Sequence, residues 1–287
     1  MMKAAILMTV HNRREKTLAC LKLCYEQIES LRSEYAFSVY LTDDASTDGT
    51  AEAVSREYPD VNIIKGNGSL YWNRGMCAAW NEAAKDAPDF YIWLNDDTLL
   101  RQGAFAALLE NSSYLRHRAI LVGTAVDNSG NYSYGGRTKS GKIIPPDPTI
   151  PVTCDIFNGN LVLVPESVYE KLGTMDPFYS HSFGDYDYGV RAEKAGIISA
   201  VAPGVLAECD RNPGVPKWRD ASYPLKERFR ALTGPKGRPP KEQFVYDTRL
   251  SNAVVAIIHY VSLLVKVLFP KKNKGVTFTA TPSQPLF

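Results

Sequence analysis

Phe90-Tyr91-Ile92-Trp93-Leu94-Asn95-Asp96-Asp97-Thr98 is a short apolar run that ends on an acidic turn. An earlier stretch repeats this arrangement, since the apolar residues 37–41 precede Asp43-Asp44-Ala45-Ser46-Thr47-Asp48. In an open α/β sheet, ligands bind where the strands end, so the two turns are predicted to share one crevice. Neighbouring carboxylates repel each other unless a cation neutralises them. A hard divalent ion, Mg²⁺ or Mn²⁺, that also binds a diphosphate would supply this charge, and the pattern therefore indicates a nucleotide-handling protein.

Apolar periodicity divides the chain into two halves and a C-terminal extension. Strand and helix patterns alternate over residues 1–100, which favours a parallel, doubly wound sheet. Residues 101–210 look like mixed α+β, and 211–287 contain a basic loop and an apolar helix. The expected strands are 4–10, 37–41, 61–64, 90–94, 120–126, 132–136, 157–164 and 197–201. The expected helices are 15–31, 50–57, 73–87, 102–109, 165–172, 185–195 and 253–269, with loops at 137–151 and 212–241.

The composition is that of an ordinary soluble protein, with 45% apolar and 22% charged residues. A net charge of +2 is too small to favour nucleic acid as the partner. Five scattered cysteines indicate neither a disulfide framework nor a zinc site, and they favour a reducing compartment. The apolar run at the N-terminus is too short for a signal peptide. We therefore expect a cytoplasmic protein.

The two acidic turns of the first half offer separate roles. A carboxylate of the first turn, Asp43 or Asp44, is able to accept from a pyrimidine N3–H or a ribose hydroxyl. In the second turn we expect Asp97 to bind the metal directly, and Asp96 to support phosphate, ribose or metal-bound water. The alternative is that these residues only form turns and helix caps. The presence of two such turns in one half favours the functional interpretation.

A third acidic stretch is Ser182-Phe183-Gly184-Asp185-Tyr186-Asp187-Tyr188-Gly189-Val190-Arg191. Asp185 and Asp187 stand two residues apart at a predicted helix start, so their side chains point in different directions. The helix dipole favours an ionised carboxylate there, while burial by the aromatic neighbours raises its pKa. A general base for a sugar hydroxyl needs such an intermediate setting. The alternative is that both residues only favour the helix start.

Taken in order, these segments resemble the family 2 glycosyltransferases with the GT-A fold, over roughly Lys3 to Asp210. That fold is α/β, with a Rossmann-like, mainly parallel sheet flanked by helices; here a helical extension would follow it. The resemblance implies an inverting enzyme that moves a sugar from a nucleoside diphosphate to a hydroxyl. Asp185 would deprotonate that hydroxyl, and the metal would neutralise charge on the leaving diphosphate. Its second half, 101–210, would hold the sugar and the acceptor.

The resemblance also assigns sites to individual residues. Asp43 would contact the base or ribose, and Asp97 the metal, with Asn95 and Glu208 as further candidate ligands. Asn158 and Asp187 fall in the region of the acceptor, and Asn158 would share a strand face with Asn160. The remaining candidates for the nucleotide and donor site are Thr9, His11, Asn12, Arg13, Asp44, Asn73, Arg74 and Asp96.

The chain departs from the family pattern at three positions. Asn95 replaces the first Asp of the metal motif, and Gly184 stands where many members have Glu. A downstream His is replaced by Ala207-Glu208-Cys209-Asp210, which leaves the third protein ligand open. The stretch 68–75 and the Leu-Asn-Asp-Asp-Thr form resemble bacterial enzymes of surface polysaccharide synthesis, including rhamnosyltransferases. A hexosyl or deoxyhexosyl transfer is therefore expected.

The apolar residues 253–269 are too few, and too interrupted by His259 and Lys266, for a membrane span. A basic flank follows at 270–274. Together they predict an interfacial helix that contacts the inner face of the cytoplasmic membrane through 253–274. The alternatives are a helix docked on the catalytic domain or a dimer contact.

The expected partners are a UDP- or dTDP-sugar, Mn²⁺ or Mg²⁺, and a glycan or lipid-linked acceptor. Two other functions are weighed against this one. A nucleotidyltransferase would need a glycine-rich phosphate loop after the first strand, and residues 9–13 contain no glycine. A non-catalytic sugar-nucleotide or glycan-binding protein stays open because of the missing Asp and His. The sequence predicts no oligomeric state.

Overall fold

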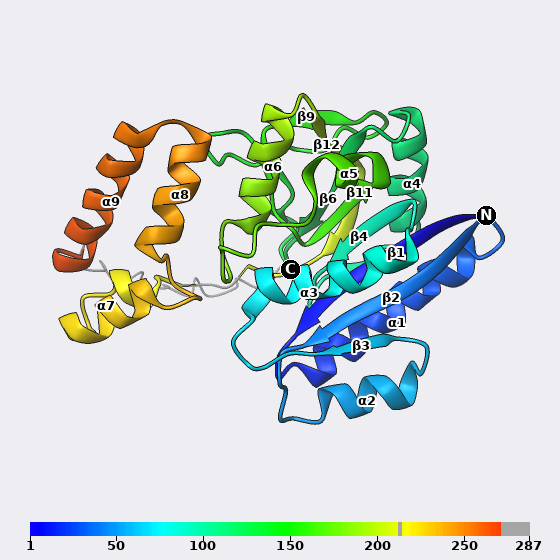
Figure 1. Ribbon diagram of the computed structural model, residues 1–287, viewed down its shortest axis with the longest axis horizontal. Helices are drawn as coiled ribbons and strands as arrows, with labels where there is room; N and C mark the ends of the chain where they lie inside the picture. The colour runs from blue at the N-terminus through cyan, green and yellow to red at the C-terminus, as the bar shows by residue number, and fades with distance from the viewer. Residues whose placement is uncertain (212–213, 271–287) are drawn as a thin grey trace, which may run out of the picture.

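The computed structural model describes residues 1–211 and 214–270. Its first half is a parallel sheet in the order β3-β2-β1-β4, as the alternating pattern predicts. Figure 1 shows these strands in blue and cyan beside the helices that connect them. The strands are β1 (Met2–Val10), β2 (Tyr35–Asp43), β3 (Asn62–Lys65) and β4 (Phe90–Leu94); the helices are α1 (Arg14–Leu31), α2 (Thr50–Glu57), α3 (Tyr71–Ala83) and the 3₁₀ turn η1 (Ala84–Asp86).

The second half continues the same sheet with mixed strand directions. β11 pairs antiparallel with β4 and β6, and β12 runs parallel to β6. β12 is longer than the expected strand at 197–201, because it stays paired with β6 as far as Glu208 across two irregularities in register. The elements are β5 (Leu99–Leu100), α4 (Ala104–Tyr114), β6 (Ala119–Val126), β7 (Tyr132–Tyr134), β8 (Gly136–Arg137), β9 (Val152–Cys154), β10 (Ile156–Phe157), β11 (Leu161–Pro165), α5 (Glu166–Leu172), α6 (Gly184–Lys194) and β12 (Ile198–Glu208).

Two expected strands are interrupted. The predicted strand at 157–164 divides into β10 and β11 around a turn at 158–160, so Asn158 and Asn160 do not share a strand face. The predicted strand at 132–136 likewise divides, and its second part, β8, pairs with β10 in a separate two-stranded sheet. The turn requires Gly159, because a β-carbon there would lie 2.5 Å from the ring of Trp72. This close approach joins two segments that are far apart in the sequence.

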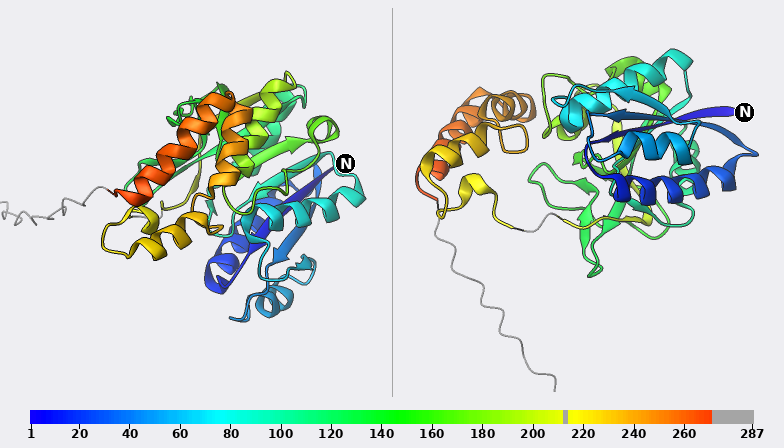
Figure 2. Two further views of the ribbon diagram at one scale, coloured as in Figure 1. Left: turned by 60° about the vertical axis from the view of Figure 1, so that its left-hand side comes forward. Right: turned by 90° about the horizontal axis from the view of Figure 1, so that it is seen from below.

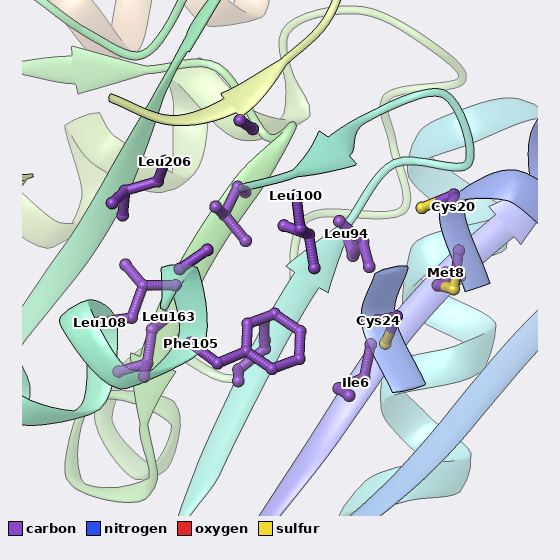
Figure 3. Close-up of a cluster of buried hydrophobic side chains, with 14 of the residues drawn as sticks. Ile6, Met8, Cys20, Cys24, Leu94, Leu100, Phe105, Leu108, Leu163 and Leu206 are labelled. Carbon is purple, nitrogen blue, oxygen red and sulfur yellow. The ribbon is translucent and has the colours of Figure 1, made fainter. Parts of the chain in front are cut away.

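Strand residues alternate between two cores on opposite faces of the sheet. Ile6 and Met8 of β1 pack with α1 and α4, as Figure 3 shows. Ala5 and Leu7 face the other way, toward α3, α5 and α6. Because successive strand side chains point to opposite faces, a strand covered on both sides reads as a continuous apolar run. This is why the apolar runs in the sequence predict these strands closely.

The C-terminal extension contains more helix than expected. The predicted loop at 212–241 includes η2 (Lys217–Arg219), α7 (Leu225–Thr233) and the start of α8 (Pro240–Leu250). The prolines that favour a loop in the sequence stand at helix starts: Pro224 precedes α7 and Pro240 lies in the first turn of α8, where proline is tolerated. The last helix, α9 (Ala253–Leu268), agrees with the prediction. Figure 1 shows α7, α8 and α9 gathered at one side, with α8 between α9 and α6.

Truncation of Trp80 tests the second core. This side chain is fully buried among the rings of Tyr91, Trp93 and Tyr188. We expect Trp80→Ala to lower the free energy of unfolding by about 3–5 kcal/mol, because the cavity collapses only partly. The matched control is Tyr114→Ala on α4, where 71% of the side chain is exposed and the change should be within about 0.5 kcal/mol. Equal losses in urea unfolding would contradict this account of the core.

Candidate functional site

Three parallel strands end at one level and bring the predicted turns together. Val10 lies opposite Asp43 at the end of the β1–β2 ladder, and β4 ends beside them. Arg13 then joins the two acidic groups of the second turn, since its Nη1 lies 3.1 Å from Oδ1 of Asp96 and 2.7 Å from Oδ2 of Asp97. The structure therefore places both acidic turns at one sheet edge, as the sequence predicts.

The two carboxylates of the first turn have different surroundings. Asp44 accepts from the backbone N–H groups of Gly68 at 2.8 Å and Tyr71 at 2.9 Å, so it holds the loop that leads into α3. Asp43 accepts through Oδ1 from the N–H of Ser46, at 3.2 Å. Among the described residues no hydrogen bond engages its Oδ2. Asp43 is therefore the member of this pair that has an oxygen left for a nucleoside.

The residues after β1 support the first turn. Nδ1 of His11 lies 2.7 Å from the carbonyl oxygen of Asp44. The amide N–H of Asn12 donates to Oγ of Ser46 at 2.9 Å, and its Oδ1 accepts from the N–H of Thr47 at 2.7 Å. These predicted donor-site residues thus fix the backbone of the turn. Thr9 is nearly buried against α3 and supports it from beneath: a β-carbon on Gly75 would lie 2.1 Å from its Oγ1.

Asp96 and Asp97 differ in access to solvent. Asp96 is buried, and burial raises its pKa to about 6, although attraction to Arg13 opposes the shift. Its Oδ2 is enclosed without a partner among the described residues. One quarter of the Asp97 side chain is exposed. A magnesium or manganese ion is commonly bound by one or two carboxylates and the substrate's phosphates, and this oxygen set fits such an ion.

Asn95 and Trp72 connect the second turn to the rest of the site. Nε1 of Trp72 donates to Oδ1 of Asn95 at 2.6 Å, and the N–H of Asn95 donates to the carbonyl of Asn160 at 3.0 Å. The side-chain oxygen of Asn95 is thus engaged by the Trp72 ring, and its expected role as a metal ligand stays a prediction. That ring lies against Gly159, which also lies close to Asp185.

The end of β12 supplies Cys209 in place of the expected Glu208. Glu208 is half exposed and pairs with Arg101 at 3.0 Å, so the structure gives no support to its expected role as a metal ligand. Sγ of Cys209 is directed instead at Oδ1 of Asp97, at 3.7 Å, and burial raises the pKa of this thiol to about 12. Because neighbouring residues of an extended chain face opposite ways, Cys209 faces Asp97 while Glu208 faces Arg101. In the parts of the chain that the structure describes, no group of three His, Cys, Asp or Glu side chains is arranged to hold a metal.

Asp185 lies at the start of α6, across Gly159 from Trp72. It accepts from the N–H of Gly159 through Oδ2 and from the N–H of Tyr186 through Oδ1, both at 2.9 Å. Burial raises the pKa of Asp185 to about 6, and these hydrogen bonds oppose the rise. Phe183, just before it, adopts a left-handed backbone with φ of 72°, a strained conformation that is typical of functional sites. A carboxylate with this pKa is ionised at neutral pH and is still able to accept a proton.

The two candidates for acceptor binding, Asn158 and Asp187, have different surroundings in the structure. Asn158 lies beside Asp185, where its Oδ1 accepts from Arg137 at 2.7 Å and its Nδ2 donates to the hydroxyl of Tyr186 at 3.1 Å. Asp187 has no exposed surface, and it pairs with Arg191 at 3.0 Å and with a second arginine. Its predicted contact with the acceptor is wrong, because the turn of α6 directs it into the protein.

Asn73 and Arg74 hold the segment 176–180 rather than facing the crevice. Nδ2 of the buried Asn73 donates two 2.8 Å hydrogen bonds to carbonyls of this segment, and Nε of Arg74 donates a third at 3.0 Å. In the structure both residues support the segment before Asp185, and their expected contact with the donor stays a prediction. A β-carbon on Gly184 would lie only 1.7 Å from Oδ1 of Asn73, so the two residues fit each other closely.

The C-terminal helix α8 contacts this same segment, which the sequence did not predict. Oε1 of Glu242 accepts from Oγ of Ser180 at 2.8 Å, and the ring of Tyr246 stacks on that of Phe183 with centroids 5.3 Å apart. Arg249 pairs with Asp187 at 2.9 Å and with a second carboxylate, Asp176, at 2.8 Å. No local pattern reveals these contacts, because they join positions about sixty residues apart.

His181 completes the site from the same segment. Its Nδ1 is buried and has no partner among the described residues. Burial lowers the pKa of His181 to about 4, and the nearby charges of Lys236 and Arg13 lower it further. His181 is neutral at physiological pH.

Loss of Arg249 tests the connection between α8 and the segment 176–187, which contains Asp185. Removing one partner of a buried carboxylate is costly, so we expect Arg249→Met to lower the free energy of unfolding by about 2–3 kcal/mol. Arg191 still neutralises Asp187, which keeps the loss below that of an isolated pair. The control is Arg56→Met, whose side chain is mostly exposed and should cost less than about 0.5 kcal/mol. A neutral Arg249→Met in denaturant unfolding would show that the pairs do not hold α8.

Comparison with known proteins identifies the group to which these features belong. The sequence model of glycosyl transferase family 2 matches residues 5–167. The N-acetylglucosaminyl-diphospho-decaprenol L-rhamnosyltransferase of Mycobacterium tuberculosis is 27% identical over 205 residues, 61% of this chain. The chain spans 66% of the length of that relative. The family match confirms the resemblance seen in the sequence.

The solved structures that share this architecture include Staphylococcus aureus TarS and a mannosyltransferase. Staphylococcus aureus TarS 1–349 in complex with UDP gives a TM-score of 0.58 at 13% identity, covering 93% of this chain and 71% of that one. The mannosyltransferase PcManGT of Pyrobaculum calidifontis, in complex with GDP-Man and Mn²⁺, gives 0.54 at 19% identity, covering 93% and 72%. At these identities the likeness shows the fold alone. It confirms the expected GT-A fold.

Proposed function

We propose that this chain, which belongs to glycosyltransferase family 2 because the family model spans more than half of it, is an inverting transferase with Asp185 as its general base. One observation carries the proposal. Gly159 contacts both Trp72 and Asp185, and Trp72 is hydrogen-bonded to the turn that holds Asp97. This chain of contacts links the proposed proton acceptor to the proposed phosphate-side carboxylate, and it supports a single site for displacement at a sugar carbon.

The reaction is a single displacement at the anomeric carbon. The acceptor's hydroxyl oxygen forms a bond to that carbon while the bond to the diphosphate breaks, and the electron pair leaves with the nucleoside diphosphate. Asp185 takes the hydroxyl proton. Its raised pKa suits this task, because a base works best when its pKa lies near the working pH. The two N–H groups on its oxygens keep the carboxylate oriented.

The donor is a nucleoside-diphosphate sugar, which we propose to be UDP- or dTDP-linked. Solved relatives carry UDP and UDP-GlcNAc in one case and GDP-Man in another. Uracil and thymine both present an N3–H donor, which suits the remaining oxygen of Asp43. His11, Asn12 and Thr9 support that turn, and Asp44 supports the loop beside it. Arg13 carries the cation nearest to the expected diphosphate.

We propose that Mn²⁺ or Mg²⁺ accompanies the diphosphate. Asp97 would hold the ion, with Asp96 beside it through its enclosed Oδ2. When bound, such an ion neutralises the negative charge that develops on the leaving group. Arg13 already offsets part of the negative charge of Asp96 and Asp97. Together with the ion, it would leave little need for further charged residues of the chain at this place.

The acceptor is proposed to be a glycan or a lipid-linked sugar of bacterial cell-surface polysaccharide synthesis. The relative from Mycobacterium tuberculosis is named for transfer of L-rhamnose to a lipid-linked N-acetylglucosamine diphosphate. A transferred hexose or deoxyhexose fits this relationship. A lipid-linked acceptor also places the enzyme at the inner face of the cytoplasmic membrane. The nucleotidyltransferase and binding-protein alternatives have less support, because the family match indicates a transferase.

Asp185→Asn tests the base. We expect transfer from a labelled UDP- or dTDP-sugar to fall by about 10²–10⁴-fold, with donor affinity unchanged, because only proton removal is lost. The unsubstituted enzyme should lose kcat/KM tenfold per pH unit below about 6, where Asp185 becomes protonated.

Asp96 titrates in the same range, so the pH profile is repeated in Asp96→Asn. The acid limb should persist there and disappear with the Asp185 substitution. Full transfer by Asp185→Asn, in protein with an unchanged unfolding midpoint, would exclude this residue as the base.

Asp97→Ala tests the metal site. Donor binding in the presence of Mn²⁺, followed by thermal shift, should weaken by at least about tenfold, and turnover should lose its dependence on the ion. Glu208→Gln is the matched control, since Glu208 pairs with Arg101 and faces away. Unchanged metal dependence in Asp97→Ala would place the ion elsewhere.

A further inference from the structure

Helix α9 exposes a continuous apolar stripe. Its inner face, with Ala256, Leu263 and Val267, is buried, and the last two pack with Trp218 and Leu232. A helix at the surface of a water-soluble domain normally turns polar residues outward. Here the outward positions follow helical spacing and are apolar: Val254, Ile257, Ile258, Val261, Val265 and Leu268 are each 44–66% exposed.

The segment that carries this stripe is rich in positive charge. Residues 214–270 contain ten Lys and Arg against four Asp and Glu, whereas residues 1–211 contain twenty against twenty-seven. Within α9 there is no acidic residue, and Lys266 lies in its last turn. The lysines at 271, 272 and 274, part of the expected basic flank, lie outside the described residues. The chain's modest net charge therefore hides a separation between an acidic body and a basic extension.

The stripe lies at the outer side of the extension. Figures 1 and 2 show α9 at the edge of the molecule, with α8 between it and the α/β body. Its main contacts within the described chain are with α8, α7 and η2. Among the residues that the structure describes, none covers the outward apolar side chains, which stay about half exposed.

We propose that the outer face of α9 docks on the surface of a membrane that contains anionic phospholipids. Apolar side chains would enter the acyl boundary while the surrounding lysines and arginines meet lipid phosphates. The excess positive charge favours this occupant over a second copy, which would carry the same charge. None of the described helices is long and apolar enough to cross a bilayer, and α9, at 16 residues or about 24 Å, fits a position in the interface.

This docking would place the catalytic segment near the membrane. α9 packs on α8, and α8 holds Ser180 through Glu242 and Asp187 through Arg249. The docking surface and the segment that carries Asp185 are thus bound to one helix. The purpose of the docking, delivery of a lipid-linked acceptor, rests on the proposed function. The binding of α9 to lipid does not, because it needs no catalysis.

Flotation of the full chain with lipid vesicles tests the proposal. We expect binding to vesicles that contain phosphatidylglycerol, much weaker binding to phosphatidylcholine alone, and a loss of binding at high salt. The variant I257E/V261E should bind at least about tenfold more weakly, because two apolar contacts are replaced by charges. The matched control I150E/I198E adds the same charge at exposed apolar positions of the body and should bind as the unsubstituted chain does.

Three outcomes would overturn the proposal. They are no flotation with anionic vesicles, equal flotation of I257E/V261E, or a dimer in analytical ultracentrifugation that this variant dissociates. Hydrolysis of a UDP- or dTDP-sugar in solution, measured on the same samples, shows that the variant is folded. It also separates the two proposals: flotation without any sugar transfer refutes the proposed function alone, and transfer without flotation refutes the docking alone.

Discussion

The pairing of Arg13 with Asp96 and Asp97 is the interaction on which the site depends. Parallel strands that end at one level necessarily bring their following turns together, and here both turns are acidic. A guanidinium between two carboxylates offsets their repulsion, and it permits Asp96 to be buried. The same charge marks the place where a diphosphate would be attracted. The geometry of the sheet and the chemistry of the crevice therefore have one origin.

In two of the acidic pairs, one residue is held by the protein and the other is proposed to take part in the chemistry. Asp44 is engaged by two backbone N–H groups, whereas Asp43 keeps an oxygen. Asp187 is neutralised inside the protein, whereas Asp185 faces Gly159. In both pairs the supporting residue fixes the local backbone. The fixed backbone in turn positions the other residue of the pair. Asp44 and Asp187 are held rigidly, so the residue beside each of them keeps its position without packing into the core itself.

The sequence predicted the parts of the fold that depend on local pattern. β4 and α2 have the expected bounds, because a buried strand and a short capped helix are both visible in a few residues. The break at Gly159 was not visible, since it depends on the ring of Trp72 from another part of the chain. For the same reason, the spacing of Asp185 and Asp187 predicted that they diverge but not which one faces the crevice. That choice depends on Arg249, sixty residues later.

Because Gly184 and Asn73 are in close contact, the residue that is tolerated at one position depends on the residue at the other. The family resemblance places a glutamate before the catalytic aspartate, but in this chain any side chain at 184 would overlap the amide of Asn73. Asn73 in turn holds the segment that precedes Asp185. A glutamate is therefore accessible here only if position 73 changes as well. Relatives should vary at these two positions jointly, and redesign of this site must treat them as one unit.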